Sequence, residues 1–169
     1  SEFPCRYHIN QISSKESLEV IKKNKNNGKK FSVGVSINNL SLNENDIGEF
    51  KTFLKISPPL RTEEDRLSLV QGIKENLIDV IVSDHLPEDE ESKRLPFAQA
   101  ATGAIGIETL LPLSLEMYHN ESLPLNKIIE TITINPSKIL KINKGSLRKG
   151  SDGDICIFDL EAPWKLDAE

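Results

Sequence analysis

The run Leu77-Ile78-Asp79-Val80-Ile81-Val82-Ser83, followed at once by Asp84 and His85, decides the fold of this 169-residue chain. Nearly every residue of the run is apolar and its length is that of a strand, which is typical of a parallel strand buried on both faces. In parallel α/β sheets, ligands and catalytic groups gather at the carboxyl ends of the strands. The run therefore predicts an α/β protein with Asp84 at the edge where a site would form.

Strands and helices alternate on the N-terminal side of this run. Two pairs with capping-box spacing, Ser13 with Glu16 and Thr62 with Asp65, precede segments with apolar residues at helical intervals. They predict helices that end near residues 25 and 76. The predicted strands are residues 6–12, 31–36, 53–56 and 77–83. Because no glycine-rich phosphate loop follows any of them, a nucleotide-binding sheet is not supported.

The C-terminal side is helical at first and then changes character. A polar loop over 86–103 leads to predicted helices at 105–118, 125–132 and 135–140, the last with Asn135 as its cap before Pro136. Beyond Gly145, the alternating residues 154–158 predict a strand of a β-rich module. We therefore divide the chain into an α/β part, 1–143, and a β-rich segment, 144–169.

Composition excludes several classes of partner. The chain has 21 basic and 26 acidic residues and a net charge of −5, whereas nucleic acid or an anionic membrane would favour a positive excess. It has no apolar stretch of membrane-spanning length. Its two cysteines lie at opposite ends, which excludes a disulfide framework and fits a reducing cytoplasm. A complete (β/α)8 barrel needs roughly 200 residues or more, so we expect a barrel to be only partly present, as in a truncated piece.

Asp84 is the strongest candidate for catalysis. A carboxylate at the end of a buried parallel strand can bind a metal or act as a general base. The alternative is that Asp84 only caps the next turn of the chain.

A set of ordered motifs adds a family resemblance. It consists of KISPPLR (55–61), DR (65–66), IDVIVSDHLP (78–87) and GAIGIET (103–109), followed by NP (135–136), GSLRKG (145–150) and GD (153–154). In this order, over about residues 7–158, the set resembles dihydroorotases of the amidohydrolase superfamily. The resemblance implies that 1–143 form the C-terminal half of a TIM-like barrel, with strands 5 to 8 and their helices. It also implies that 144–169 begin the small β-sandwich domain.

The same resemblance implies a function. Dihydroorotases are cytoplasmic hydrolases of pyrimidine synthesis that reversibly convert N-carbamoyl-L-aspartate to dihydroorotate, usually with zinc. By motif position, Asp84 is the catalytic proton carrier and a metal ligand. Substrate contacts are implied for Ser57 and for the backbone N–H groups of Ala101, Thr102 and Gly103.

The chain departs from the family pattern at several of these positions. Gln11 and Asn39 stand where the family has histidine ligands, and a carboxamide binds zinc poorly because it offers only a neutral oxygen. Ser57 replaces an asparagine, and Glu88 replaces a histidine and would repel an anionic substrate. The metal site is therefore expected to be depleted.

The three histidines are expected to have mainly structural roles. His8 shares its strand face with Asn10 and not with Gln11, so we interpret it as structural. His85 is expected to orient Asp84 or its loop, or to touch the site. His119 is expected on the surface at a helix C-terminus, where its charge is favourable.

Three readings remain open from the sequence. In the first, a missing N-terminal half supplies metal ligands and Asp84 moves the proton; three protein ligands and a water suffice for catalytic zinc. In the second, the chain is part of a non-catalytic subunit that serves aspartate carbamoyltransferase as a structural partner. The third, a hydantoinase or allantoinase relative, is disfavoured by the 55–61 and 84–87 motifs. Since half a barrel has open strand edges, we expect the missing half or a second copy to pack against it, and the isolated chain to be inactive without stoichiometric zinc.

Overall fold

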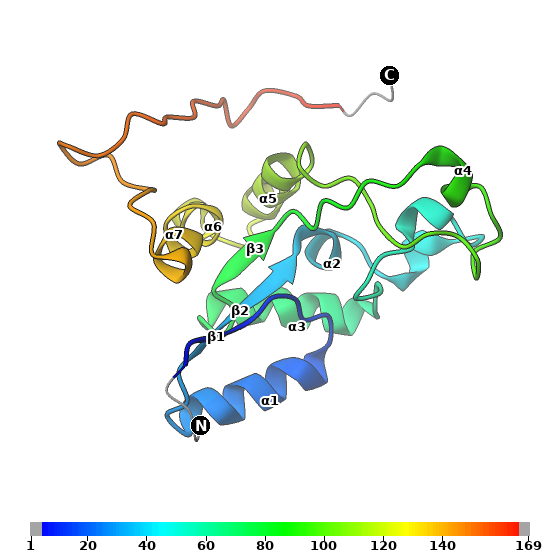
Figure 1. Cartoon of the computed structure of the whole chain (residues 1–169), viewed down its shortest axis with the longest axis horizontal. Coiled ribbons are helices and arrows are strands. Elements are labelled where there is room, and N and C mark those ends of the chain that lie inside the picture. The colour runs from blue at the N-terminus through cyan, green and yellow to red at the C-terminus, as the bar shows by residue number, and fades with distance from the viewer. Residues whose placement is uncertain (1–4, 166–169) are drawn as a thin grey trace.

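The computed structural model describes residues 5–165 and contains a parallel three-stranded sheet (Figure 1). The strands are β1 (Tyr7–Ile9), β2 (Phe31–Ser36) and β3 (Val80–Val82), in the order β1-β2-β3. The helices are α1 (Lys15–Asn26), α2 (Ile37–Ser41), α3 (Glu63–Lys74), α4 (Glu90–Lys93), α5 (Leu110–His119), α6 (Leu125–Ile132) and α7 (Ile134–Leu140), with two 3-10 turns, η1 (Glu44–Ile47) and η2 (Thr52–Leu54). The predicted α/β class is confirmed.

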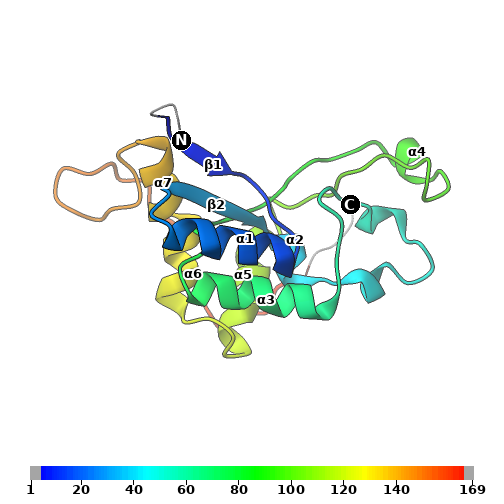
Figure 2. The same ribbon diagram turned by 90° about the horizontal axis from the view of Figure 1, so that it is seen from below.

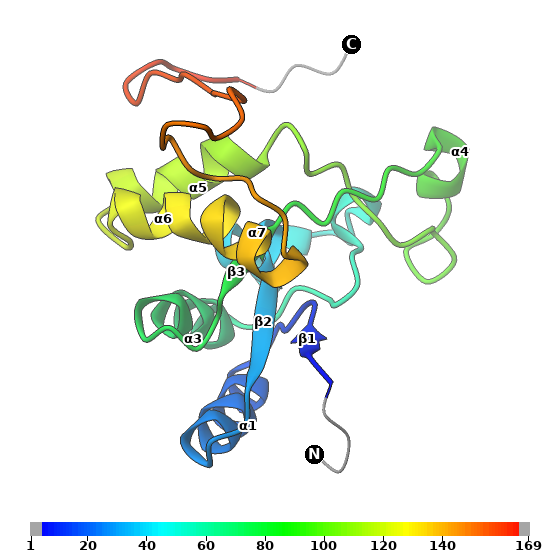
Figure 3. The same ribbon diagram turned by 60° about the vertical axis from the view of Figure 1, so that its left-hand side comes forward.

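The helices lie on two sides of the strands. Helix α1 connects β1 to β2, α3 connects β2 to β3, and the two helices pack side by side (Figure 2). Helix α6 packs against β3 and α7, and Figure 3 shows the strands between the α1–α3 pair and the group α5, α6 and α7. None of the described helices is long and apolar enough to cross a membrane.

The core lies where β2 and β3 meet these helices. Val33 and Val35 of β2 are fully buried and belong to one apolar cluster with Ile81 of β3, Ile73 of α3 and Ile128 of α6. Burial of one such side chain contributes roughly 1.5–3 kcal/mol. By contrast, every residue of β1 is exposed, because β1 lies at the edge of the sheet and has only one neighbouring strand.

The predicted helix starts are nearly correct. Thr62 and Asp65 form a reciprocal capping box at the start of α3, as their spacing predicts. Helix α1 is capped one residue later than expected, since the side chain of Ser14, and not that of Ser13, accepts from the Ser17 N–H at 3.3 Å. Ser13 is buried and its hydroxyl instead meets the Arg61 guanidinium at 3.5 Å.

The strand predicted at 53–56 is wrong. This segment overlaps η2 and then passes through the cis peptide bond between Ser57 and Pro58. Two successive prolines lack the N–H groups that a parallel ladder needs, so β2 pairs directly with β3. The sheet thus has three of the four expected strands.

The strand predicted at 154–158 is also wrong for the described residues. The segment is exposed and forms no ladder. Its alternating pattern finds no partner strand, and a single strand cannot pair its own backbone groups. The assignment of 144–169 to a small β domain remains a prediction.

Other bounds differ in detail. The helix predicted at 105–118 begins only at Leu110, and the loop at 86–103 contains α4. The N-cap of α7 is Thr133 and not Asn135. The side-chain amide of Asn135 instead donates to the Asp79 carbonyl at 2.9 Å.

Candidate active site

The carboxyl ends of the three strands lie at one edge of the sheet and bring two predicted site residues together. Gln11 follows β1 and Asp84 follows β3, and β2 lies between these strands. The Gln11 Nε2 donates to Asp84 Oδ1 at 2.5 Å, and both side chains are half-buried. The carboxylate is therefore held by an amide from the opposite edge of the sheet.

Asp84 also turns the chain. Its φ is +52°, in the left-handed region that Asp tolerates better than most residues. Directly after it, His85 forms a parallel bridge with Ala104, and the Leu86 N–H donates to the Ala104 carbonyl at 2.8 Å. The next helix, α4, is capped by Asp89, so Asp84 is not a helix cap.

Asn39 lies in the short helix α2, which directly follows the carboxyl end of β2. It is 3% exposed, and its Nδ2 donates to the Pro59 carbonyl at 3.1 Å. Its Oδ1 is buried and has no hydrogen-bond partner. The amide is thus oriented by the Pro-Pro loop that follows the cis bond.

The residues at this edge do not fit the zinc that the dihydroorotase resemblance implies. Zinc is bound by thiolate, imidazole or carboxylate groups, usually at least three of them. Here Gln11 and Asn39 offer neutral amides, and the Gln11 amide already occupies one oxygen of Asp84. The described residues contain no group of three His, Cys, Asp or Glu side chains placed to hold a metal.

The predicted substrate loop lies beside this edge. Gly103 packs on the chain just after Asp84, where an added Cβ would stand 2.4 Å from the Leu86 carbonyl oxygen. The N–H of Ala101 donates to the Ser92 carbonyl at 3.1 Å and that of Gly103 to the Lys55 carbonyl at 2.9 Å. Of the three predicted backbone donors, only that of Thr102 has no partner among residues 5–165.

Two lysines organise this loop. Lys93, at the end of α4, is 4% exposed, and its ammonium donates to the carbonyls of Ala101 at 2.9 Å and Gly103 at shorter range. Burial lowers the pKa of Lys93, and the nearby charge of Lys55 lowers it further, while Glu88 opposes the shift. The Lys55 ammonium donates to the carbonyls of residues 97, 98 and 100 at 2.7–3.1 Å.

The structure places the other departures from the family pattern at the surface. Ser57 is exposed, with no hydrogen bond from its side chain among the described residues, and precedes the cis bond to Pro58. Glu88 is exposed in the loop before α4.

The histidines serve local structure. His8 Nδ1 lies 2.7 Å from Ser32 Oγ, its cross-strand neighbour in β2. His85 Nδ1 accepts from the N–H groups of Gly106 at 3.1 Å and Ile107 at 3.4 Å, so it anchors the returning loop. His119 is exposed in the last turn of α5.

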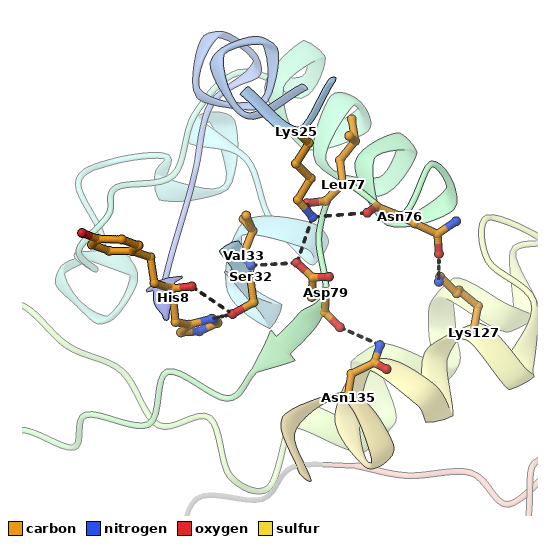
Figure 4. Close-up of polar contacts among 10 residues, drawn as sticks. His8, Lys25, Ser32, Val33, Asn76, Leu77, Asp79, Lys127 and Asn135 are labelled. Carbon is orange, nitrogen blue, oxygen red and sulfur yellow. Dashed lines mark hydrogen bonds and ion pairs between the residues drawn. The ribbon is translucent and has the colours of Figure 1, made fainter. Parts of the chain in front are cut away.

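Asp79, a polar residue that the sequence analysis missed, joins β2 and β3 on the side away from the candidate site. Asp79 Oδ2 accepts from the Val33 N–H at 2.8 Å and from the Lys25 ammonium at 3.0 Å (Figure 4). The signal was present, because Asp79 is the one charged residue in the apolar run 77–83. Nothing comparable marks Lys55 or Lys93, since a lysine in a polar loop is usually solvated.

Curated proteins similar to the chain are dihydroorotases. The chain is 45% identical over 161 residues to the dihydroorotase of Ehrlichia canis, covering 95% of the chain and 36% of that protein. It is 40% identical over 162 residues to the dihydroorotase of Aquifex aeolicus, covering 96% of the chain and 38% of that protein. The chain thus spans little more than a third of the length of these relatives.

Solved structures give the same fold. The L-hydantoinase of Arthrobacter aurescens superposes with a TM-score of 0.83 at 28% identity, over 90% of this chain and 35% of that one. A dihydropyrimidinase from Brevibacillus agri superposes with a TM-score of 0.77 at 21% identity, over 88% of this chain and 34% of that one. These hydantoinases are amidohydrolase TIM barrels, so the three strands described here are part of such a barrel. The model of the amidohydrolase family matches residues 8–169, and the chain belongs to that family.

Proposed function

We propose that the protein to which this chain belongs is a cyclic-amide hydrolase that interconverts dihydroorotate and N-carbamoyl-L-aspartate in pyrimidine synthesis. The observation that carries this proposal is the 45% identity to a dihydroorotase over nearly the whole chain. The hydantoinase alternative has less support, because the L-hydantoinase and the dihydropyrimidinase described above are only 28% and 21% identical to the chain. Cytoplasmic action accords with the two free, exposed cysteines, Cys5 and Cys156.

In this proposal Asp84 carries the proton. Hydrolysis forms a C–O bond from water to the amide carbon, breaks the ring C–N bond and moves one proton from the water to the departing nitrogen. A carboxylate beside the reacting groups can take that proton and return it. Gln11 holds Asp84 Oδ1, and Oδ2 has no hydrogen-bond partner among residues 5–165, so Oδ2 is the oxygen that exchanges the proton.

Amidohydrolases generally use a metal, and the resemblance names zinc. In this chain the amides of Gln11 and Asn39 do not match it, so we assign no step to a metal. Of the three strand-end residues Gln11, Asn39 and Asp84, only Asp84 has a side chain that suits zinc as a ligand.

The alternative of a non-catalytic subunit bound to aspartate carbamoyltransferase has no support from the relatives or from the fold. We do not propose that partner. Because amides replace histidines at positions 11 and 39, the test below also measures whether the gene product lacks activity.

The test is an assay of dihydroorotate hydrolysis and of the reverse cyclisation, with the complete gene product and with the 169-residue chain. The gene product is expected to turn over dihydroorotate faster than hydantoin. The chain alone is expected to be inactive. Asp84→Asn should lower turnover at least about 100-fold, the lower end for loss of a general base. Asp89→Asn, which alters only the cap of α4, is the matched control.

Faster turnover of hydantoin, or full activity of the Asp84→Asn variant, would contradict the proposal. Metal analysis of the same samples measures whether zinc is bound and at what stoichiometry. Stoichiometric zinc in the 169-residue chain would contradict our conclusion that its strand-end residues do not fit the metal.

A further inference from the structure

Two ammonium groups bind five of the seven carbonyls of the segment 97–103, which lies after α4 and returns to the site. Lys55 binds the carbonyls of 97, 98 and 100, and Lys93 binds those of 101 and 103. The two sets do not overlap. Lysines 55 and 93 therefore divide the segment between them, and we call them the lysine pair.

Lys93 is the more unusual member of the pair. A lysine is almost never fully buried unless it is paired with an acid, yet Lys93 is 4% exposed and makes no ion pair among the described residues. Its cradle is completed by the carbonyls of Thr52 at 3.2 Å and Lys55 at 3.5 Å. Its own carbonyl accepts from the Thr52 hydroxyl. All of its hydrogen bonds go to backbone carbonyls, and the charge of Glu88 compensates further for its burial, so removing the ammonium releases the backbone that surrounds it.

Among the N–H groups of residues 101–103, one donates to no acceptor in the part of the chain that the structure describes. Lys93 binds the carbonyls on both sides of Thr102, while the N–H groups of Ala101 and Gly103 donate to the carbonyls of Ser92 and Lys55. The Thr102 N–H therefore has a fixed direction and no hydrogen-bond partner among residues 5–165. Gly103 packs against Leu86, two residues beyond Asp84, which places this donor beside the strand-end edge.

We propose that Lys93 is a positioning residue that presents the Thr102 backbone N–H to an acceptor oxygen of the substrate beside Asp84. This inference rests on the proposed function for the nature of the substrate. The way in which the lysine pair holds the loop does not depend on that function, and amide hydrogen exchange tests it separately.

The first measurement is amide hydrogen exchange over residues 95–104 in the purified gene product. Lys93→Met keeps the length of the side chain and removes the ammonium, so exchange at Ala101 and Gly103 should accelerate at least tenfold. Lys55→Met should instead loosen residues 97–100. Lys74→Met, at the exposed end of α3, is the matched control and should change neither segment. Unchanged exchange at Ala101 and Gly103 in Lys93→Met would overturn the inference.

The second measurement is steady-state kinetics with dihydroorotate. Loss of one aimed hydrogen bond should raise KM by about tenfold in Lys93→Met while kcat falls less than threefold. A general loss of structure would instead lower the active fraction and leave KM unchanged. Lys93→Arg, which keeps a buried cation, should restore part of the binding.

Thr102→Pro tests the donor directly, because it removes an N–H that makes no hydrogen bond within residues 5–165. It should raise KM as Lys93→Met does, and Thr102→Ala, which keeps the N–H, should raise it much less than Thr102→Pro. If Lys93→Met does not fold, this pair of variants decides the question, and equal KM values for the two would overturn the inference. If the gene product does not act on dihydroorotate, the proposed function fails, and hydrogen exchange still tests the lysine pair.

Discussion

Asp79 offers the sharpest test of what holds the sheet in register. Its Oδ2 pairs the N–H of Val33, which is completely buried, and the ammonium of Lys25. Asp79→Ala leaves that N–H unpaired in the core, at a cost of roughly 1–3 kcal/mol. It also removes an ion pair whose side chains are 20% and 33% exposed, which contributes roughly 1 kcal/mol. The free energy of unfolding should therefore fall by about 3 kcal/mol.

Asp79→Asn separates the two contributions. The amide oxygen can still accept from the Val33 N–H, so only the ion pair is lost and the expected fall is about 1 kcal/mol. Combining it with Lys25→Met gives a double-mutant cycle whose coupling energy should be of similar size. Urea unfolding followed by far-ultraviolet circular dichroism measures the four proteins of this cycle and Asp79→Ala. If Asp79→Ala and Asp79→Asn are equally destabilised, the buried N–H is not the main term and the reasoning is refuted.

Three further predictions concern the neighbourhood of the site and the stability of the chain. Gly106→Ala would place a Cβ 2.0 Å from the Ser83 carbonyl oxygen, so it should destabilise by more than about 2 kcal/mol in the same urea assay, and a neutral result would contradict this contact. The Arg66 guanidinium lowers the pKa of Glu63 to about 2 from its ordinary 4.5. Because the folded-state value is the lower one, this stabilisation is present above pH 4.5 and is lost as the pH falls towards 2. With Glu63 45% exposed, it amounts to less than about 1 kcal/mol, and Glu63→Gln should flatten that part of the stability–pH curve. Gln11→His places an imidazole beside Asp84 and should raise zinc affinity at least tenfold in equilibrium dialysis, whereas no gain would argue against a metal position at this edge.

The sequence predicted the parts of the fold that depend on local pattern. The apolar run that contains β3 and the capping box of α3 are both legible in a single segment. The segment 53–56 has strand-like residues but forms no strand, because it overlaps a 3-10 turn and is followed by two prolines, which lack the N–H groups of a ladder. Residues 154–158 show that an alternating pattern needs a partner strand before it becomes a strand.

The candidate site was predictable only in part. Asp84 could be found because its position at the end of a buried strand is a property of the sequence. Its contact with Gln11 could not, since no local signal links two residues that far apart. Lys93 could not be found either, because its burial depends on carbonyls of two segments, 52–55 and 101–103, that are distant from each other in the sequence.

The hydrogen bond between Gln11 and Asp84 joins positions 73 residues apart in the chain. Side chains alternate between the faces of a strand, so a shift of β1 by one residue would turn Gln11 to the opposite face and break this contact. The acidic group thus acquires its partner only after both strand pairings have reached their native alignment. A chain in which β1 is misaligned would lack this hydrogen bond, so the chemical environment of the Asp84 carboxylate reports on whether β1 has reached its native alignment.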